Sequence, residues 1–259
     1  MAAAFDRVEV TNIDDLKPGD AVIFNLESNT QEGIVTVVSP HRADKQLGLV
    51  DVVNYQQTPK GITTVIEKAM FFDLHKHTII QKAYVNSFDA TTVIARARSR
   101  IDERRYDSKE NSNRHFVEWA KVGYESNLLV VSPHFSSEHQ LVNLYNAYSW
   151  FDIERGSIID FLYYGIRHQG VVTHVDKENS QVKVIHYGTN HIFATRTVIR
   201  DTIHIDFKTQ LIRIYRCNQS DKCNKPNDVA TKAEKRLGEQ KWNVFWLRSW
   251  SFCLQCLFN

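Results

Sequence analysis

Residues 168–175 read HQGVVTHV and residues 31–38 read QEGIVTVV, so the chain carries nearly the same β-branched run twice. Each run follows an apolar segment with a glycine-containing turn in front of it, at residues 153–162 and 16–25. Identical residues fall at one constant offset: Gly19 and Gly156, Phe24 and Phe161, Gly33 and Gly170, Thr36 and Thr173. This ordered similarity indicates an internal repeat.

The similarity continues towards the C-terminus after a small slip in register. The further matches are residues 52–56 with 184–188, 63–75 with 195–208, and 95–107 with 231–243. We therefore predict two copies of one unit, in residues 1–124 and 150–259, with residues 125–149 as a connecting segment.

Each copy is predicted to be an α+β unit. Runs of β-branched residues separated by polar turns are typical of antiparallel strands, and charged, helix-favouring stretches follow them. In the first copy, Phe116, Trp119 and Ala120 have helical spacing and Gly123 is a typical C-cap residue. The expected fold is a small antiparallel sheet with helices packed on one side.

The composition is that of an ordinary globular protein, with 42% hydrophobic and 24% charged residues in a chain of 259. A formal net charge of +2 provides no bulk field that would attract nucleic acid, so we expect no nucleic-acid partner. The N-terminal MAAAFDRVEV has no apolar signal core. Four cysteines, all after residue 216, do not have the pattern of a secreted disulfide framework. The expected location is the cytoplasm.

The most apolar stretch is the tail, VFWLRSWSFCLQCLFN, at residues 244–259. It is shorter than a membrane span and Arg248 interrupts it, so we expect at most peripheral membrane contact through this tail. The cysteine spacing does not match a structural zinc site, and the chain has no P-loop, GxGxxG or HExxH motif. We expect no metal and no cofactor.

Two histidines of the second copy are candidate site residues. His168 and His186 lie on two predicted strands that are joined by the polar turn DKENSQ. Cross-strand neighbours in a hairpin have Cβ atoms about 5 Å apart, so the two imidazole rings could touch. One imidazole can generate a nucleophile while a second polar group orients it. Two strand histidines can equally be surface residues or satisfied core residues.

The order of these elements resembles the lecithin:retinol acyltransferase (LRAT) family, which has a permuted papain-like fold related to the NlpC-type peptidases. The resemblance extends along both copies. LKPGD at 16–20 is similar to the opening turn, RHQGVVTHV at 167–175 to the first-histidine strand, and VIHY at 184–187 to the second-histidine strand. NSNRHFVEWAKVG at 111–123 is similar to the helix that carries the nucleophile.

This resemblance implies thiol-mediated acyl transfer or lipid hydrolysis, with His168 as the base and His186 as the residue that orients it. The first copy departs from the pattern at all three catalytic positions, which Gln31, Asn54 and Asn113 occupy. An amide acts neither as a thiolate nor as a base near neutral pH. We therefore expect the first copy to be non-catalytic.

The second copy keeps both histidines but lacks the expected cysteine. Matching Tyr106 with Trp242 aligns Asn113 with Ser249, which is then at the nucleophile position. Ser249 is either a nucleophile activated by His168 or a remnant of a decayed site. Cys253 is an alternative nucleophile about one helical turn further on, which would require a different local register.

Two classes of function follow from this reading. One is an enzyme related to phospholipid or retinoid acyltransferases and thiol hydrolases, impaired because neither copy has the nucleophilic cysteine. The other is a pseudoenzyme that uses the fold to bind a lipid or a protein. A phospholipid or another acyl ester is the expected small-molecule partner. Relative to the LRAT pattern, the second copy is short at its C-terminal end.

Overall fold

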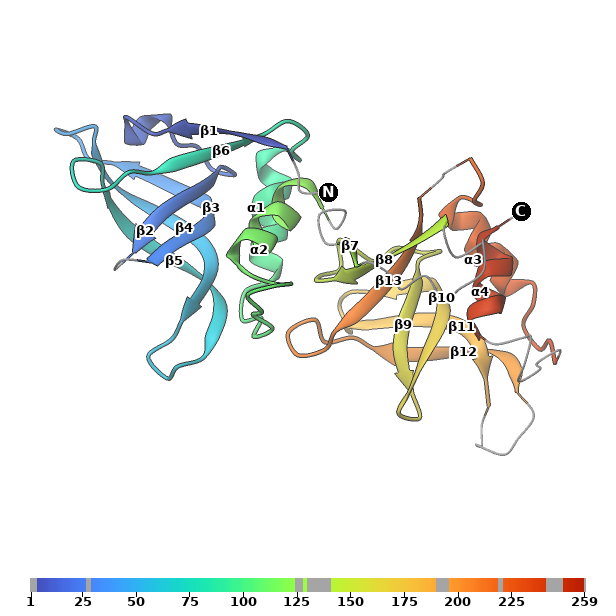
Figure 1. The fold of residues 1–259 in the computed structure, drawn as a ribbon. Helices are drawn as coiled ribbons and strands as arrows, with labels where there is room; N and C mark the ends of the chain where they lie inside the picture. The colour runs from blue at the N-terminus through green and yellow to red at the C-terminus, as the bar shows by residue number, and fades with distance from the viewer. Residues whose placement is uncertain are drawn as a thin grey trace. The chain divides into compact units, whose positions relative to one another are not determined.

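The protein is described here by a computed structural model, which covers residues 4–26, 29–123, 128–129, 141–189, 196–218, 221–240 and 249–258. The chain divides into two compact units, Met1–Asn127 and Leu128–Asn259. Both units combine an antiparallel sheet with two α-helices, so the predicted α+β class is confirmed (Figure 1).

The sheet of the first unit has the strand order β1-β6-β2-β3-β4-β5. Its strands are β1 (Phe5–Glu9), β2 (Ala21–Leu26), β3 (Asn29–Pro40), β4 (Leu47–Gln57), β5 (Thr63–Asp73) and β6 (Ile80–Tyr84). A short 3-10 turn, η1 (Ile13–Asp15), follows β1. The helices α1 (Ala90–Ser99) and α2 (Asn113–Val122) both contact β3 and β4, and Gly123 is the C-cap of α2, as predicted.

The sheet of the second unit has the strand order β12-β11-β10-β9-β13-β8-β7. Its strands are β7 (Leu128–Leu129), β8 (Val142–Ala147), β9 (Ile158–Tyr163), β10 (Ile166–Asp176), β11 (Gln181–Gly188), β12 (Thr197–His204) and β13 (Ile212–Cys217). The helices are α3 (Pro226–Glu234) and α4 (Ser249–Leu257), and both contact β10.

The two sheets have the same strand order over six strands. Read from the other edge, the second sheet runs β8-β13-β9-β10-β11-β12, with each strand in the place of β1, β6, β2, β3, β4 and β5. β8 therefore corresponds to β1, although residues 125–149 were expected to be a connecting segment. This part of the expectation is corrected: β8 is hydrogen-bonded to β13 and completes the second sheet.

The same irregularity interrupts the same strand in both units. The register between β3 and β4 shifts at Thr36, and the register between β10 and β11 shifts at Thr173. Each threonine hydroxyl donates to a carbonyl of the next strand at 3.2 Å, Asp51 O in one case and Lys183 O in the other. A β-bulge at one position is a specific feature of a backbone. Its presence at the same position in both units, with the same threonine hydrogen bond, supports the internal repeat.

A polar cluster of the same three residue types occurs in both units, buried in the first and partly exposed in the second. The hydroxyl of Tyr55 donates to Glu103 at 2.7 Å, and Arg100 donates to the same carboxylate through Nε at 2.6 Å. In the second unit, the hydroxyl of Tyr187 donates to Glu239 and Arg236 donates to Glu239, both at 2.7 Å. Each cluster connects the strand that carries the tyrosine, β4 in the first unit and β11 in the second, to the segment between the two helices of that unit.

The part of the apolar tail that forms α4 packs inside the second unit. Phe252, Cys253 and Cys256 of α4 have no exposed surface, and Leu254 and Leu257 are also buried. Packing inside the second unit accounts for the apolar composition of these residues. Peripheral membrane contact through the tail stays a prediction. Within the described ranges, no helix has the length and hydropathy that a membrane crossing requires.

The opening turn of each unit depends on a glycine with positive φ. Gly19 has φ +91° and Gly156 has φ +88°. A Cβ atom on Gly156 would lie 1.9 Å from the Pro226 carbonyl oxygen at the start of α3, whereas one on Gly165, with φ +77°, would meet no atom within 4 Å. The turn can therefore approach the helix only because residue 156 has no side chain.

We predict that Gly156→Ala destabilises the second unit by clearly more than Gly165→Ala. The control variant has only the backbone cost of the left-handed conformation, about 1 kcal/mol. Gly156→Ala adds a clash with backbone atoms that cannot rotate away. Urea unfolding curves of the two variants measure the difference. Equal midpoints would contradict the close packing of this turn against α3.

Candidate functional site

The second unit brings three of the sequence-predicted site residues together. His168 is on β10, His186 is on β11 and Ser249 is the first residue of α4. All three are buried, with His168 8% exposed, Ser249 4% and His186 not exposed. The alignment that placed Ser249 opposite Asn113 is consistent with the fold, because Asn113 is the first residue of α2. Trp242, which set this alignment, lies outside the described residues.

The two imidazole rings are in direct contact. Their centroids are 4.8 Å apart and the ring planes meet at 82°, an edge-to-face arrangement. The rings of Phe161 and Tyr163 on β9 pack against both histidines, with centroid distances between 4.7 Å and 5.8 Å. Aromatic packing therefore restricts both imidazoles, and within the described part of the chain no hydrogen bond joins one histidine to the other.

The partner of His186 is Asp201, which lies on β12. His186 Nε2 is 2.9 Å from Asp201 Oδ2. Because a carboxylate oxygen accepts, Nε2 carries the proton and donates it. The other nitrogen, Nδ1, is buried and has no hydrogen-bond partner among the described residues. Burial lowers the pKa of His186, although Asp201 acts in the opposite direction.

His168 Nε2 faces two oxygen atoms. The carbonyl oxygen of Tyr187 lies 2.9 Å away, and Ser249 Oγ lies 2.5 Å away. A carbonyl oxygen can only accept, so the neutral imidazole is favoured as the tautomer with its proton on Nε2. Ser249 Oγ then accepts from the same N–H, and its own hydroxyl donates to the Tyr187 carbonyl at 3.5 Å.

The surroundings also keep His168 uncharged. Burial first and the nearby His186 second lower the pKa of His168, which is about 4, while the hydrogen bond to the Tyr187 carbonyl acts in the opposite direction. At neutral pH the imidazole is therefore neutral, and its lone pair is on Nδ1. A general base must present its lone pair to the proton that it removes. In this geometry Nε2, the nitrogen next to Ser249, presents a proton.

The first unit has an amide network at the same place. Asn113 Nδ2 donates to Gln31 Oε1 at 2.6 Å and to the carbonyl oxygen of Tyr55 at 3.1 Å. The backbone N–H of Tyr55 donates to Asn113 Oδ1 at 2.7 Å. Asn54 is fully buried and its Nδ2 has no hydrogen-bond partner in the described part of the chain. Asn113 and Gln31 therefore satisfy each other, Asn54 does not join them, and none of the three amides is a nucleophile or a base.

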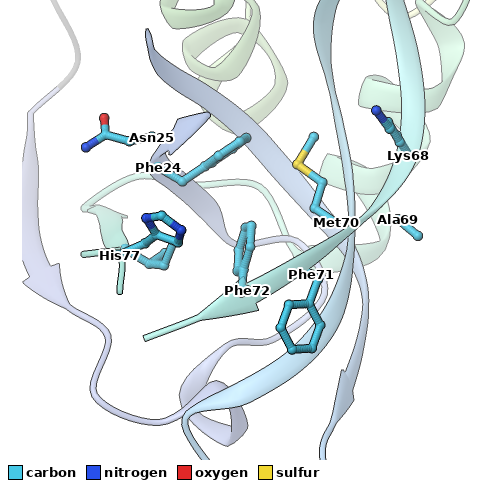
Figure 2. A pocket seen from close by; sticks show the side chains of 9 residues that line it. Phe24, Asn25, Lys68, Ala69, Met70, Phe71, Phe72 and His77 are labelled. Atoms are coloured by element: carbon cyan, nitrogen blue, oxygen red, sulfur yellow. The ribbon is translucent and has the colours of Figure 1, made fainter. Parts of the chain in front are cut away.

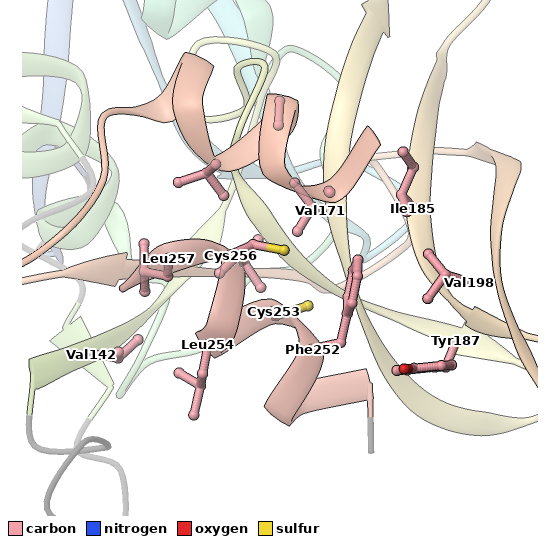
Figure 3. Close-up of a cluster of buried hydrophobic side chains, with 14 residues drawn as sticks. Val142, Val171, Ile185, Tyr187, Val198, Phe252, Cys253, Leu254, Cys256 and Leu257 are labelled. Atoms are coloured by element: carbon pink, nitrogen blue, oxygen red, sulfur yellow. The ribbon is translucent and has the colours of Figure 1, made fainter. Parts of the chain in front are cut away.

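Cys253 does not take part in the site. It lies in the buried hydrophobic cluster of the second unit, and Figure 3 shows its sulfur among apolar side chains together with that of Cys256. Burial raises the pKa of the Cys253 thiol well above its ordinary value. A thiol that stays protonated is a poor nucleophile, so the geometry argues against Cys253 as the alternative nucleophile.

The remaining two cysteines are paired. Cys217 at the end of β13 forms a disulfide with Cys223. The sequence predicted no secreted disulfide framework, and it did not single out this one pair. Asn224 follows the second cysteine of this pair. Its Nδ2 donates to the carbonyl oxygens of Cys256 and Phe258, both at 3.0 Å, and so satisfies carbonyl groups at the end of α4.

The repeat comparison missed one residue of the site. His186 pairs with Ile199 across β11 and β12, and Asn54 pairs with Ile66 across β4 and β5. Because these two strand pairs are equivalent, Asp201, two residues after Ile199, aligns with Lys68, two residues after Ile66. An aspartate inside a β-branched run is unusual, and this was the available signal. Among the described residues, no group of three or more His, Cys, Asp or Glu side chains is arranged to hold a metal ion.

Comparison with known proteins does not assign the chain to a family. No protein-family model matches the sequence, and no curated protein matches it with significant similarity.

We predict that the second unit loses stability when the pH falls below about 6.5. His168 has a folded pKa of about 4, below its unfolded value of 6.5. Between these values the unfolded chain binds the proton and the folded chain does not, so stability rises with pH across this window. The shift corresponds to at most about 3 kcal/mol between pH 7 and pH 4.

Urea unfolding at pH 7 and pH 4.5 measures this effect, and tryptophan fluorescence reports mainly on the second unit. His168→Gln, which introduces the residue found at the same position of the first unit, should reduce the pH dependence. His174→Gln removes an exposed imidazole from the same strand and is the matched control. An unchanged pH dependence in His168→Gln would show that this histidine is not buried in its neutral form.

Proposed function

We propose that this protein is a tandem LRAT-like pseudoenzyme with two permuted papain-like units. The first unit has lost all three catalytic groups. The second keeps His168 and His186 but has a serine where thiol acyl chemistry needs a cysteine. In this proposal the second unit binds an acyl ester, such as a phospholipid, without turning it over.

The observation that carries this proposal is the hydrogen bond from His168 Nε2 to the Tyr187 carbonyl oxygen. A thiolate accepts a hydrogen bond from a facing N–H, and this carbonyl favours the form of His168 with a proton on Nε2. A serine needs the opposite, a neutral imidazole that accepts the hydroxyl proton. The histidine is thus oriented for a cysteine, while the position beside it holds Ser249.

A second candidate function is a slow serine acyl hydrolase. It is favoured by the distance of 2.5 Å between Ser249 Oγ and His168 Nε2, and by the position of Ser249 at the N-terminus of a helix, where developing negative charge is stabilised. This function requires His168 to lose its bond to Tyr187 and to present the Nε2 lone pair to Ser249.

We predict that Ser249→Cys creates a reactive thiol and that Asn113→Cys does not. Both variants place one cysteine at the first residue of the equivalent helix, but only residue 249 has an imidazole beside it. In Ser249→Cys, the thiol proton is transferred to His168, which then has a proton on both nitrogens and donates from Nε2 to the thiolate. The negative thiolate favours the imidazolium that burial disfavours beside Ser249. Its alkylation by iodoacetamide should therefore persist well below pH 8.5, the ordinary thiol pKa being about 8.5.

Peptide mapping after alkylation at pH 6 separates the new cysteine from Cys253 and Cys256. His168→Ala in the Ser249→Cys background should remove the enhanced reactivity. If Ser249→Cys reacts no faster than Asn113→Cys, His168 is not placed for thiol chemistry and the LRAT-like assignment fails. Labelling of the unmodified protein at Ser249 by a fluorophosphonate, abolished by His168→Ala, would instead establish the serine hydrolase.

A further inference from the structure

The first unit contains a hollow of about 500 Å³ that the proposed function does not use. Its walls are made of residues from β2 and β5 and of two residues between β5 and β6. The lining residues are Phe24, Asn25, Lys68, Ala69, Met70, Phe71, Phe72, His77 and Ile79. This volume is within the range of about 300–1,000 Å³ that is typical of small-molecule sites.

The interior of the hollow is apolar. Phe24 and Phe72 are in ring contact, with centroids 5.4 Å apart, and Met70 and Ile79 are buried with them. Figure 2 shows Phe24, Met70 and Phe72 arranged around the same space. Such a surface favours a hydrocarbon or aromatic group, because burial of apolar area is the main source of affinity there.

One end of the hollow is cationic. Lys68 is exposed, and alternation along β5 places it on the same face as Met70 and Phe72. None of the nine lining residues is acidic. At the equivalent position of the second unit, Asp201 pairs with His186. The two copies therefore differ in charge at this position, and the lysine of the first copy lines an apolar hollow.

We propose that this hollow binds an apolar monocarboxylate. Lys68 pairs with the carboxylate, and the hydrocarbon part lies against Phe24, Met70 and Phe72. A cation would face Lys68 without a counter-charge, and a strongly polar anion would leave the apolar walls uncovered. This site is in the first unit and does not depend on Ser249 or His168, so its test is independent of the proposed function.

Calorimetric titration of the full chain with butyrate, hexanoate and octanoate tests the proposal. We expect saturable 1:1 binding of octanoate, with affinity rising about 15-fold for every two methylenes buried. Lys68→Glu should weaken octanoate binding by about tenfold or more, since a charge-assisted contact becomes a repulsion. Lys60→Glu, at an exposed lysine in the turn between β4 and β5, makes the same change in net charge and should leave the affinity unchanged.

Three results would overturn the proposal. The first is the absence of saturable octanoate binding in a chain that is folded by circular dichroism. The second is an equal loss of affinity in Lys68→Glu and Lys60→Glu, or no loss in either, because the carboxylate would then not be recognised at Lys68. The third is binding of octyltrimethylammonium as tight as that of octanoate, which would indicate apolar adsorption without charge selection.

Discussion

A glutamate that holds a tyrosine and an arginine organises each unit of this protein. Glu103 and Glu239 lie on the segment between the two helices, and their partners Tyr55 and Tyr187 lie on the strand next to the bulged one. In the first unit Arg100 and Glu103 are both buried, so breaking their pair would leave a buried charge without a partner, which costs several kcal/mol. In the second unit the side chains of Arg236 and Glu239 are 22% and 18% exposed, so the cost there is smaller. In both units the cluster links the tyrosine strand to the segment between the two helices.

The main chain of that tyrosine decides the chemistry of the site. In the first unit, the Tyr55 carbonyl accepts from Asn113, and in the second unit the Tyr187 carbonyl accepts from His168. Ser249 Oγ lies 3.5 Å from the same Tyr187 carbonyl, so the first side chain of the last helix meets the equivalent carbonyl in both units. In the second unit this carbonyl favours the His168 tautomer with a proton on Nε2, whereas activation of the Ser249 hydroxyl would need a lone pair on that nitrogen.

Much of this arrangement was predictable from the repeat. The constant offsets through Gly19 and Gly156 predicted the equivalent turns, and the offset through the helices predicted that Ser249 takes the place of Asn113. The strand β8 was missed because its counterpart, β1, has no matching residues in the sequence comparison. Asp201 was missed because a repeat comparison detects what two copies share, and here the copies differ in charge. The Cys217–Cys223 disulfide depends on loop geometry, which cysteine spacing does not determine.

The tautomer of His168 tests the central claim most directly. Long-range ¹H–¹⁵N correlation spectra of the folded protein at pH 7 distinguish a protonated from an unprotonated ring nitrogen. We expect His168 and His186 to be neutral, each with its proton on Nε2. A neutral His168 with its proton on Nδ1 and an unprotonated Nε2 facing Ser249 would contradict this account, because it would describe a serine–histidine pair ready for catalysis.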